Sequence, residues 1–258
     1  METVDLVFTE FGDSTAEPLI ILHGFFASSR NWRQIAERLS DSFHVYVADM
    51  RNHGASPHHP QMNYEVMAAD LERFIERHGL KKAHILGHSM GGKIAMWFAL
   101  NRPANVDKLI IADIAPVTYS HRFDHTIQAL MALPLKEISN RKQAESLLAD
   151  AIPELSYRQF LLQNLVLIDG NYTWRINLDI FARTGPAITA FPDSSHLPAY
   201  RGKALFIAGA DSNYVKEQDI ARLFPDAGLV RIANAGHWLH VQQPENFIKI
   251  VGNFLKFC

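Results

Sequence analysis

Cysteine is almost absent from this sequence: Cys258, at the last position, is the only one, so no disulfide can form within the chain. Disulfides belong mainly to oxidising compartments, and this composition does not require export. The first residues lack a basic segment followed by an apolar stretch, and no run of about 18 apolar residues follows. We therefore expect a cytoplasmic protein without a signal peptide and without integral membrane association.

An excess of charge of one sign is missing too. The chain has 258 residues, in which 25 Lys and Arg stand against 27 Asp and Glu, giving a formal net charge of -2. So small a net charge does not create the field that attracts nucleic acid or an anionic membrane. The composition, 48% hydrophobic and 20% charged, is that of a folded globular protein. We therefore expect a small-molecule partner and no nucleic acid.

Short apolar runs alternate with amphipathic stretches in the first 115 residues and again after residue 200. Runs that are apolar throughout are typical of parallel strands covered on both faces, and the stretches between them have helical spacing. This rhythm predicts an α/β fold with a mostly parallel, twisted sheet and helices on both faces. The strands are expected at residues 19–22, 45–48, 84–86, 109–114, 204–208 and 229–232, and the helices at 32–39, 64–78 and 245–257.

The rhythm stops between about residue 118 and residue 200. Helical patterns occur there at 127–133, 141–151 and 158–168, without a convincing strand. We expect a helical cap at 118–200, inserted into one core domain formed by residues 1–117 and 201–258.

A candidate nucleophile lies in Gly87-His88-Ser89-Met90-Gly91, between an expected strand and an expected helix. In this context G-x-S-x-G forms a sharp, strained turn that exposes the serine hydroxyl, and glycines prevent clashes around it. The same stretch has the glycine and lysine spacing of a phosphate-binding loop through Lys93. That motif then requires Ser or Thr, and Ile94 cannot hold magnesium, so we favour Ser89 as a nucleophile.

Two further segments fit a serine hydrolase. His23-Gly24-Phe25 ends the first apolar run, where the backbone N–H of Phe25 could form an oxyanion hole with that of Met90. The alternative is a simple turn, and we expect His23 itself to be structural. His237 follows the last expected strand, which is the place of the base in the order Ser, acid, His. We interpret its neighbour His240 as a helix-start or surface residue.

Other histidines are less informative. His121 and His125 stand four residues apart and could bind a metal if their segment is helical. Neither an H-E-x-x-H pattern nor a cysteine cluster accompanies them, so we interpret both as surface residues and expect no metal.

Four motifs together carry a resemblance to a known family. The chain resembles the YbfF-type esterases of the α/β-hydrolase family over nearly its whole length, most weakly from about residue 120 to 170. Asp113-Ile114-Ala115-Pro116 also fits that branch. The motifs are His23-Gly24-Phe25-Phe26-Ala27-Ser28, Asp49-Met50-Arg51-Asn52-His53-Gly54-Ala55-Ser56, Gly87-His88-Ser89-Met90-Gly91-Gly92-Lys93 and Ala235-Gly236-His237-Trp238.

The resemblance implies an α/β-hydrolase fold with a helical cap and a carboxylesterase or thioesterase that needs no cofactor and no metal. The substrate would be an acyl ester or acyl thioester, cleaved through an acyl-enzyme on Ser89 with His237 as general base. Phe25 and Met90 would be the oxyanion donors, in agreement with the reading of the motifs. The fold alone does not choose the acyl donor.

The catalytic acid has two candidates. Most α/β-hydrolases place it last in a G-x-x-D turn after the strand that corresponds to 204–208. Here that turn reads Gly209-Ala210-Asp211-Ser212, so the aspartate comes one residue early. YbfF-type relatives resemble a different arrangement, which implies Asp113 as the acid and Ser212 as a hydrogen-bonding helper. We favour Asp113 and keep Asp211 as the alternative.

Two other functions remain open. A carbon-carbon bond hydrolase uses the same three residue types but needs polar cap residues, for which Arg122, Arg158 and Arg175 are candidates. A ligand-sensing protein would keep the triad with negligible turnover. For an esterase, an apolar acyl pocket is expected in the cap, with candidates Phe123, Leu130, Phe160, Leu161 and Phe181.

Overall fold

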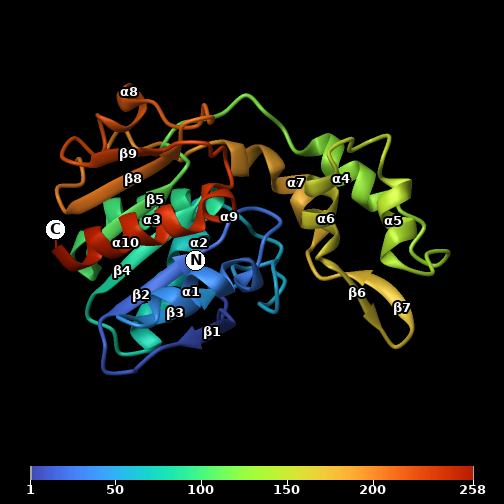
Figure 1. Cartoon of the computed structure of the whole chain (residues 1–258), viewed down its shortest axis with the longest axis horizontal. Coiled ribbons are helices and arrows are strands. Elements are labelled where there is room, and N and C mark those ends of the chain that lie inside the picture. The colour runs from blue at the N-terminus through green and yellow to red at the C-terminus, as the bar shows by residue number, and fades with distance from the viewer. Residues whose placement is uncertain (1, 258) are drawn as a thin grey trace.

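A computed structural model describes residues 2–257, so the expectation about Cys258 lies outside the described residues. Its main feature is a seven-stranded sheet in the order β1-β3-β2-β4-β5-β8-β9, parallel except for the edge strand β1 (Figure 1). The strands are β1 (Phe8–Phe11), β2 (Pro18–Leu22), β3 (His44–Ala48), β4 (Ala83–His88), β5 (Val106–Ala112), β8 (Lys203–Gly209) and β9 (Gly228–Ile232). The expected mostly parallel sheet is confirmed.

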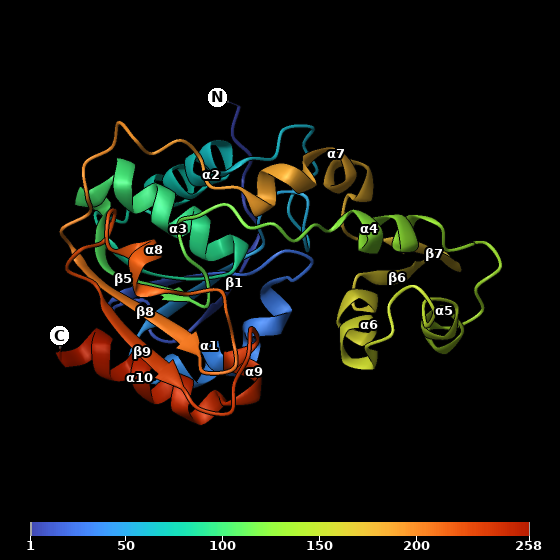
Figure 2. The same ribbon diagram turned by 90° about the horizontal axis from the view of Figure 1, so that it is seen from above.

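Helices cover both faces of this sheet. Seen from above, α2 (Tyr64–Arg77) and α3 (Met90–Asn101) lie on one side, and α1 (Arg33–Leu39) and α10 (Pro244–Phe257) on the other (Figure 2). Successive strand residues point to opposite faces, so Ile20 packs in one apolar cluster and its neighbour Ile21 in the second. Both faces of the strands therefore need apolar side chains, which is why these runs do not alternate. The shorter helices of the core are η1 (Ser29–Trp32), η2 (Pro103–Asn105), α8 (Glu217–Ile220) and α9 (Leu239–Gln242).

Residues 118–189, called the insertion below, extend to one side of the core (Figures 1 and 2). Residues 191–200 return along the core, where Arg222 donates to the hydroxyl of Ser194 at 2.6 Å and the N–H of Tyr200 to the oxygen of Leu223 at 2.8 Å.

The expectation that the insertion contains no strand was wrong. Helix α6 ends at Leu162, and residues 165–168 then pair with residues 171–174 in an antiparallel hairpin. Its turn residues, Asp169 and Gly170, have φ angles of 48° and 79°. Asp-Gly favours such a two-residue turn, and the flanking β-branched and aromatic residues suit strands. The elements are α4 (Asp124–Met131), α5 (Arg141–Leu147), α6 (Leu155–Leu162), β6 (Leu165–Ile168), β7 (Asn171–Trp174) and α7 (Leu178–Thr189).

Lys93 fastens the insertion to the core. Its side chain is buried in helix α3, and its ammonium donates to the backbone oxygens of Val117, Thr189 and Ala190 at 2.9, 2.9 and 2.7 Å. Val117 directly precedes the insertion, and Thr189 and Ala190 lie at its end, so one side chain holds both connections. Burial lowers the pKa of Lys93 to about 7.

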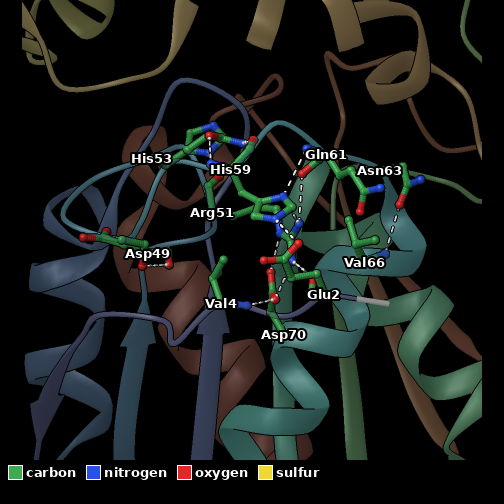
Figure 3. Close-up of polar contacts among 12 residues, drawn as sticks. Glu2, Val4, Asp49, Arg51, His53, His59, Gln61, Asn63, Val66 and Asp70 are labelled. Carbon is green, nitrogen blue, oxygen red and sulfur yellow. Dashed lines mark hydrogen bonds and ion pairs between the residues drawn. The ribbon is translucent and has the colours of Figure 1, made fainter.

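The loop after β3 is held by a buried ion pair (Figure 3). The Arg51 guanidinium makes two 2.6 Å bonds to the Asp70 carboxylate of α2 and donates to the backbone oxygen of Gln61 at 2.9 Å. Asp49 adds to this support, since its carboxylate accepts from the backbone N–H groups of Ser29 at 2.6 Å and Ala55 at 2.8 Å. The Asp49–Ser56 motif is therefore a scaffold for the loops above the sheet.

Two glycines allow a direct test of this packing. A Cβ atom on Gly87, at the end of β4, would lie 2.3 Å from the backbone oxygen of Gly91, whereas one on Gly252 in α10 would meet nothing within 4 Å. We expect Gly87→Ala to lower the free energy of unfolding in urea by about 3 kcal/mol or more. Gly252→Ala, the matched control, should raise it by up to about 1 kcal/mol through helix propensity. Equal effects of the two substitutions would contradict this account.

Candidate active site

Ser89 stands at a strained turn between β4 and α3. Its φ of 52° and ψ of -118° are rare for a residue with a side chain, and the turn persists because β4 and α3 cross closely. Gly87 permits this crossing, since a Cβ atom there would lie 2.3 Å from the backbone oxygen of Gly91, and Gly91 lets α3 approach β2, where its Cβ atom would lie 2.2 Å from the backbone oxygen of Leu22. The turn has the strand-to-helix geometry that presents a serine hydroxyl above a sheet.

Three side chains from distant parts of the chain meet at this turn. His237 Nε2 lies 3.0 Å from Ser89 Oγ, and His237 Nδ1 lies 2.8 Å from Asp113 Oδ2. An ionised carboxylate only accepts hydrogen bonds, so Nδ1 carries the proton and Nε2 is left to accept from the serine hydroxyl. The arrangement can transfer the serine proton to the imidazole while the carboxylate holds the ring.

The Asp113 carboxylate is fully buried and has two more donors. The backbone N–H of Gly209 donates to Oδ1 at 3.0 Å, and the hydroxyl of Ser212 donates to Oδ2 at 2.6 Å. Asp211, the other candidate acid, is exposed, and its backbone N–H donates to the backbone oxygen of Ala235 at 2.9 Å. The turn thus directs Ser212 toward Asp113.

Sequence reasoning missed His88, which joins the two halves of the site. Its Nε2–H donates to the backbone oxygen of His237 at 2.8 Å and so ties the nucleophile turn to the loop of the imidazole. Burial, and secondly the nearby charge of His237, lower the pKa of His88 to about 3. His88 therefore stays neutral and does not oppose a positive charge on His237. The position of His88 between Gly87 and Ser89 was the available signal.

The interpretation of His240 as a surface residue was wrong, although it does lie in the short helix α9. Its ring is buried and stacks on Trp32 with centroids 4.2 Å apart and planes 6° apart. Burial lowers the pKa of His240 well below its usual value. It is a packing residue because α9 turns back against η1.

The loop after β2 lies against the nucleophile. A Cβ atom on Gly24 would be only 3.3 Å from Ser89 Cβ, so a side chain there would crowd the serine. His23 holds this loop: Nδ1–H donates to the backbone oxygen of Gly24 at 2.8 Å, and Nε2 accepts from the backbone N–H of Met50 at 3.0 Å. Met90 is the first residue of α3, where backbone N–H groups lack partners within the helix.

A cavity of about 510 Å³ opens over Ser89 and His237 between the core and α6. Of the five expected acyl-pocket residues, Phe123 and Phe160 line it, whereas Leu130, Leu161 and Phe181 are buried outside its lining. The other large apolar and aromatic side chains of its wall are Phe25, Phe26, Trp32, Tyr157, Tyr214, Trp238 and Val241. Glu154, Ser156, Gln159, Gln163 and Asn31 add polar groups.

Cationic side chains do not face this cavity in the described part of the chain. Arg122 pairs with Asp124 at 2.6 Å, Arg158 donates to the backbone oxygens of Ile152 and Pro153, and Arg175 is also outside the lining. His121 packs on aromatic rings, and within residues 2–257 no group of three His, Cys, Asp or Glu side chains is placed to hold a metal ion.

Comparisons with known proteins identify the family to which this fold belongs. Residues 17–244 match the family model described as alpha/beta hydrolase fold, so the chain belongs to that family. It is 39% identical to the sn-1-specific diacylglycerol lipase ABHD11 of Mus musculus, over 95% of this chain and 82% of the relative. It is 36% identical to esterase YbfF of Escherichia coli K12, over 92% of both chains. The resemblance stated from the motifs is confirmed.

A solved structure described as a marine microorganism esterase superposes with a TM-score of 0.93 at 42% identity, covering 98% of this chain and 100% of that one. This structure and the two relatives together show that the chain is an ester hydrolase, whose substrate is a small-molecule ester. Over residues 2–257, every helix is too short or too polar to cross a membrane.

The cavity wall gives a prediction about acyl-chain length. Phe160→Ala should shift preference toward longer p-nitrophenyl esters, because removing the ring that packs near Trp238, with centroids 5.5 Å apart, enlarges the cavity. Leu130→Ala is the control: Leu130 is fully buried outside the lining, so it should cost about 2–5 kcal/mol of stability without that shift. A shift with Leu130→Ala alone would place the pocket elsewhere.

Proposed function

We propose that this protein hydrolyses uncharged carboxylic esters through an acyl-enzyme on Ser89, with His237 as general base and Asp113 as the acid. The observation that carries the proposal is the hydrogen-bonded chain from Ser89 Oγ through both imidazole nitrogens of His237 to the buried Asp113 carboxylate. Residues 118–200 act as the cap that covers the acyl group.

In the first half of the reaction, Ser89 Oγ attacks the ester carbonyl carbon while its proton passes to His237 Nε2. Asp113 stabilises the imidazolium that forms. The N–H groups of Phe25 and Met90 receive the negative charge on the carbonyl oxygen. The bond to the alcohol then breaks, and the alcohol oxygen takes the proton from Nε2. An acyl group remains on Ser89.

In the second half, a water molecule replaces the alcohol. His237 Nε2 takes a proton from the water as its oxygen attacks the acyl carbon, and then returns that proton to Ser89 Oγ as the acid product leaves. No cofactor or metal takes part in this proposal. Ser212 assists by donating to Asp113 Oδ2, the oxygen that also accepts from His237, and so holds the carboxylate in place for the imidazole.

The cavity favours neutral esters over the alternatives. An aromatic wall without Lys or Arg suits an acyl chain and an uncharged alcohol, and one relative is named a lipase of diacylglycerol, which is uncharged. A carbon-carbon bond hydrolase would need cationic groups for its anionic substrate, and its three candidate arginines do not line the cavity. Acyl thioesters fit the same acyl pocket and are the substrates to compare first.

Ser89→Ala tests the nucleophile. It should abolish turnover of a chromogenic ester and labelling by a fluorophosphonate, while the melting temperature stays near that of the wild type because one hydroxyl contributes little packing. Any residual catalysis would come from the oxyanion hole and binding, roughly 10³ to 10⁴ over water in other serine hydrolases. Near-normal turnover would refute the assignment. Wild-type labelling without turnover would instead favour a ligand-sensing protein.

The two aspartates give a matched pair for the acid. Asp113→Asn should lower kcat by about 10³ to 10⁴, because the amide cannot hold the imidazole in the required tautomer or stabilise its positive charge. Asp211→Asn should have a far smaller effect, since its side chain is exposed. Both are measured with one activated ester under saturating conditions. The reverse ranking would assign the role to Asp211.

A further inference from the structure

Phe26 adopts a backbone conformation that needs support. Its φ is 62°, in the left-handed region that bulky residues rarely occupy, and its side chain is buried. Such a conformation costs on the order of 1–3 kcal/mol and persists only where the surroundings impose it. Phe26 directly follows Phe25, whose N–H is a proposed oxyanion donor. The contacts that impose the conformation of Phe26 therefore also affect the position of that donor.

Part of the support comes from the insertion. Asn164, in the connection between α6 and β6, is buried, and its Nδ2 donates to the backbone oxygen of Phe26 at 2.7 Å. The same side-chain amide donates to the backbone oxygen of Leu161 at 3.2 Å, and the backbone oxygen of Asn164 accepts from the backbone N–H of Arg175 at 2.9 Å. Asn164 is thus fixed within the insertion and reaches the core loop as a rigid group.

Planar peptide units carry this contact to the oxyanion donor. The oxygen of Phe26 and the N–H of Ala27 belong to one peptide plane, and that N–H donates to the oxygen of Gly24 at 3.2 Å. The oxygen of Gly24 shares a second peptide plane with the N–H of Phe25. Holding the Phe26 oxygen therefore restrains, through two planes, the direction of the Phe25 N–H.

The core contributes to the same restraint from the other side. His23 Nδ1–H donates to the Gly24 oxygen at 2.8 Å, so the loop is held by the core at Gly24 and by the insertion at Phe26. Aromatic packing adds to the hydrogen bond from Asn164: the Phe26 ring contacts Phe123 and Phe181 of the insertion, with centroids 5.7 and 5.5 Å apart.

We propose that Asn164 is a positioning residue that sets the oxyanion hole from the insertion, so that this segment contributes to catalysis as well as to substrate binding. The proposal rests on the proposed function, since it assigns an oxyanion donor to Phe25. It predicts an effect on the transition state that is independent of acyl-chain length, because Asn164 acts on the donor and lies outside the cavity lining.

The test uses Asn164→Leu, which keeps the approximate shape without donors, and Asn164→Asp, whose carboxylate cannot donate to the Phe26 oxygen. Removing a direct oxyanion donor costs about 10² to 10³ in kcat, and we expect a loss of about tenfold or more for this indirect support. The loss should be equal for an acetate and a long-chain ester, with KM nearly unchanged, when rates are expressed per site titrated by a fluorophosphonate.

A second readout reports the oxyanion itself. Thionoesters place sulfur where the oxyanion forms, and a hole aligned for oxygen discriminates against them, so the ester-to-thionoester ratio of kcat/KM should fall in both Asn164 variants. His58→Ala is the control: it removes the 2.9 Å bond between His58 Nε2 and the Arg175 oxygen, another contact between core and insertion, and should leave the ratio unchanged.

The outcomes separate the two proposals. The role of Asn164 would be overturned if both kcat per titrated site and the ester-to-thionoester ratio were unchanged in its variants. It would also be overturned if the loss of activity came entirely from a smaller number of titratable sites. Activity that persists in Ser89→Ala would instead overturn the proposed function. A raised KM restricted to long-chain esters would make Asn164 a pocket residue and would contradict a role in the oxyanion hole.

Discussion

The hydrogen bonds that one fully buried carboxylate accepts organise the site. Asp113 accepts hydrogen bonds from His237, from the backbone N–H of Gly209 and from the hydroxyl of Ser212. A buried charge is tolerated only when such partners surround it, because each lost partner leaves a large desolvation cost. This requirement joins the end of β5, the turn after β8 and the loop that follows β9, which are far apart in the sequence.

Backbone strain gathers at the same edge of the sheet. Phe26, Ser89 and Asp113, which follow β2, β4 and β5, all have positive φ angles, of 62°, 52° and 49°. Parallel strands bring their carboxyl ends to one edge, so loops that each turn sharply can place groups close together. Close packing of β4, α3 and β2 maintains the turn at Ser89, and hydrogen bonds from both the core and the insertion restrain the loop that contains Phe26.

The insertion was the part least accessible from sequence. Its helices were expected from apolar periodicity, but short apolar runs such as residues 165–168 fit a helix or a strand equally well. Asp169-Gly170 was the deciding local signal, since it favours a two-residue hairpin turn. The burial of Lys93 was also unforeseen: the lysine that suggested a phosphate loop instead binds the backbone of both connecting segments.

The sequence by itself determined the mostly parallel sheet and the turn at Ser89, because apolar runs, glycine spacing and strand-to-helix order act over a few residues. Only the tertiary structure decided which aspartate faces His237. Asp113 and Asp211 both follow buried strands, and a single residue of offset turns Asp211 outward while bringing Ser212 to the carboxylate. The contact of Asn164 with Phe26, across 138 positions, was equally invisible, since local patterns do not specify which distant groups the packed chain brings within hydrogen-bond reach.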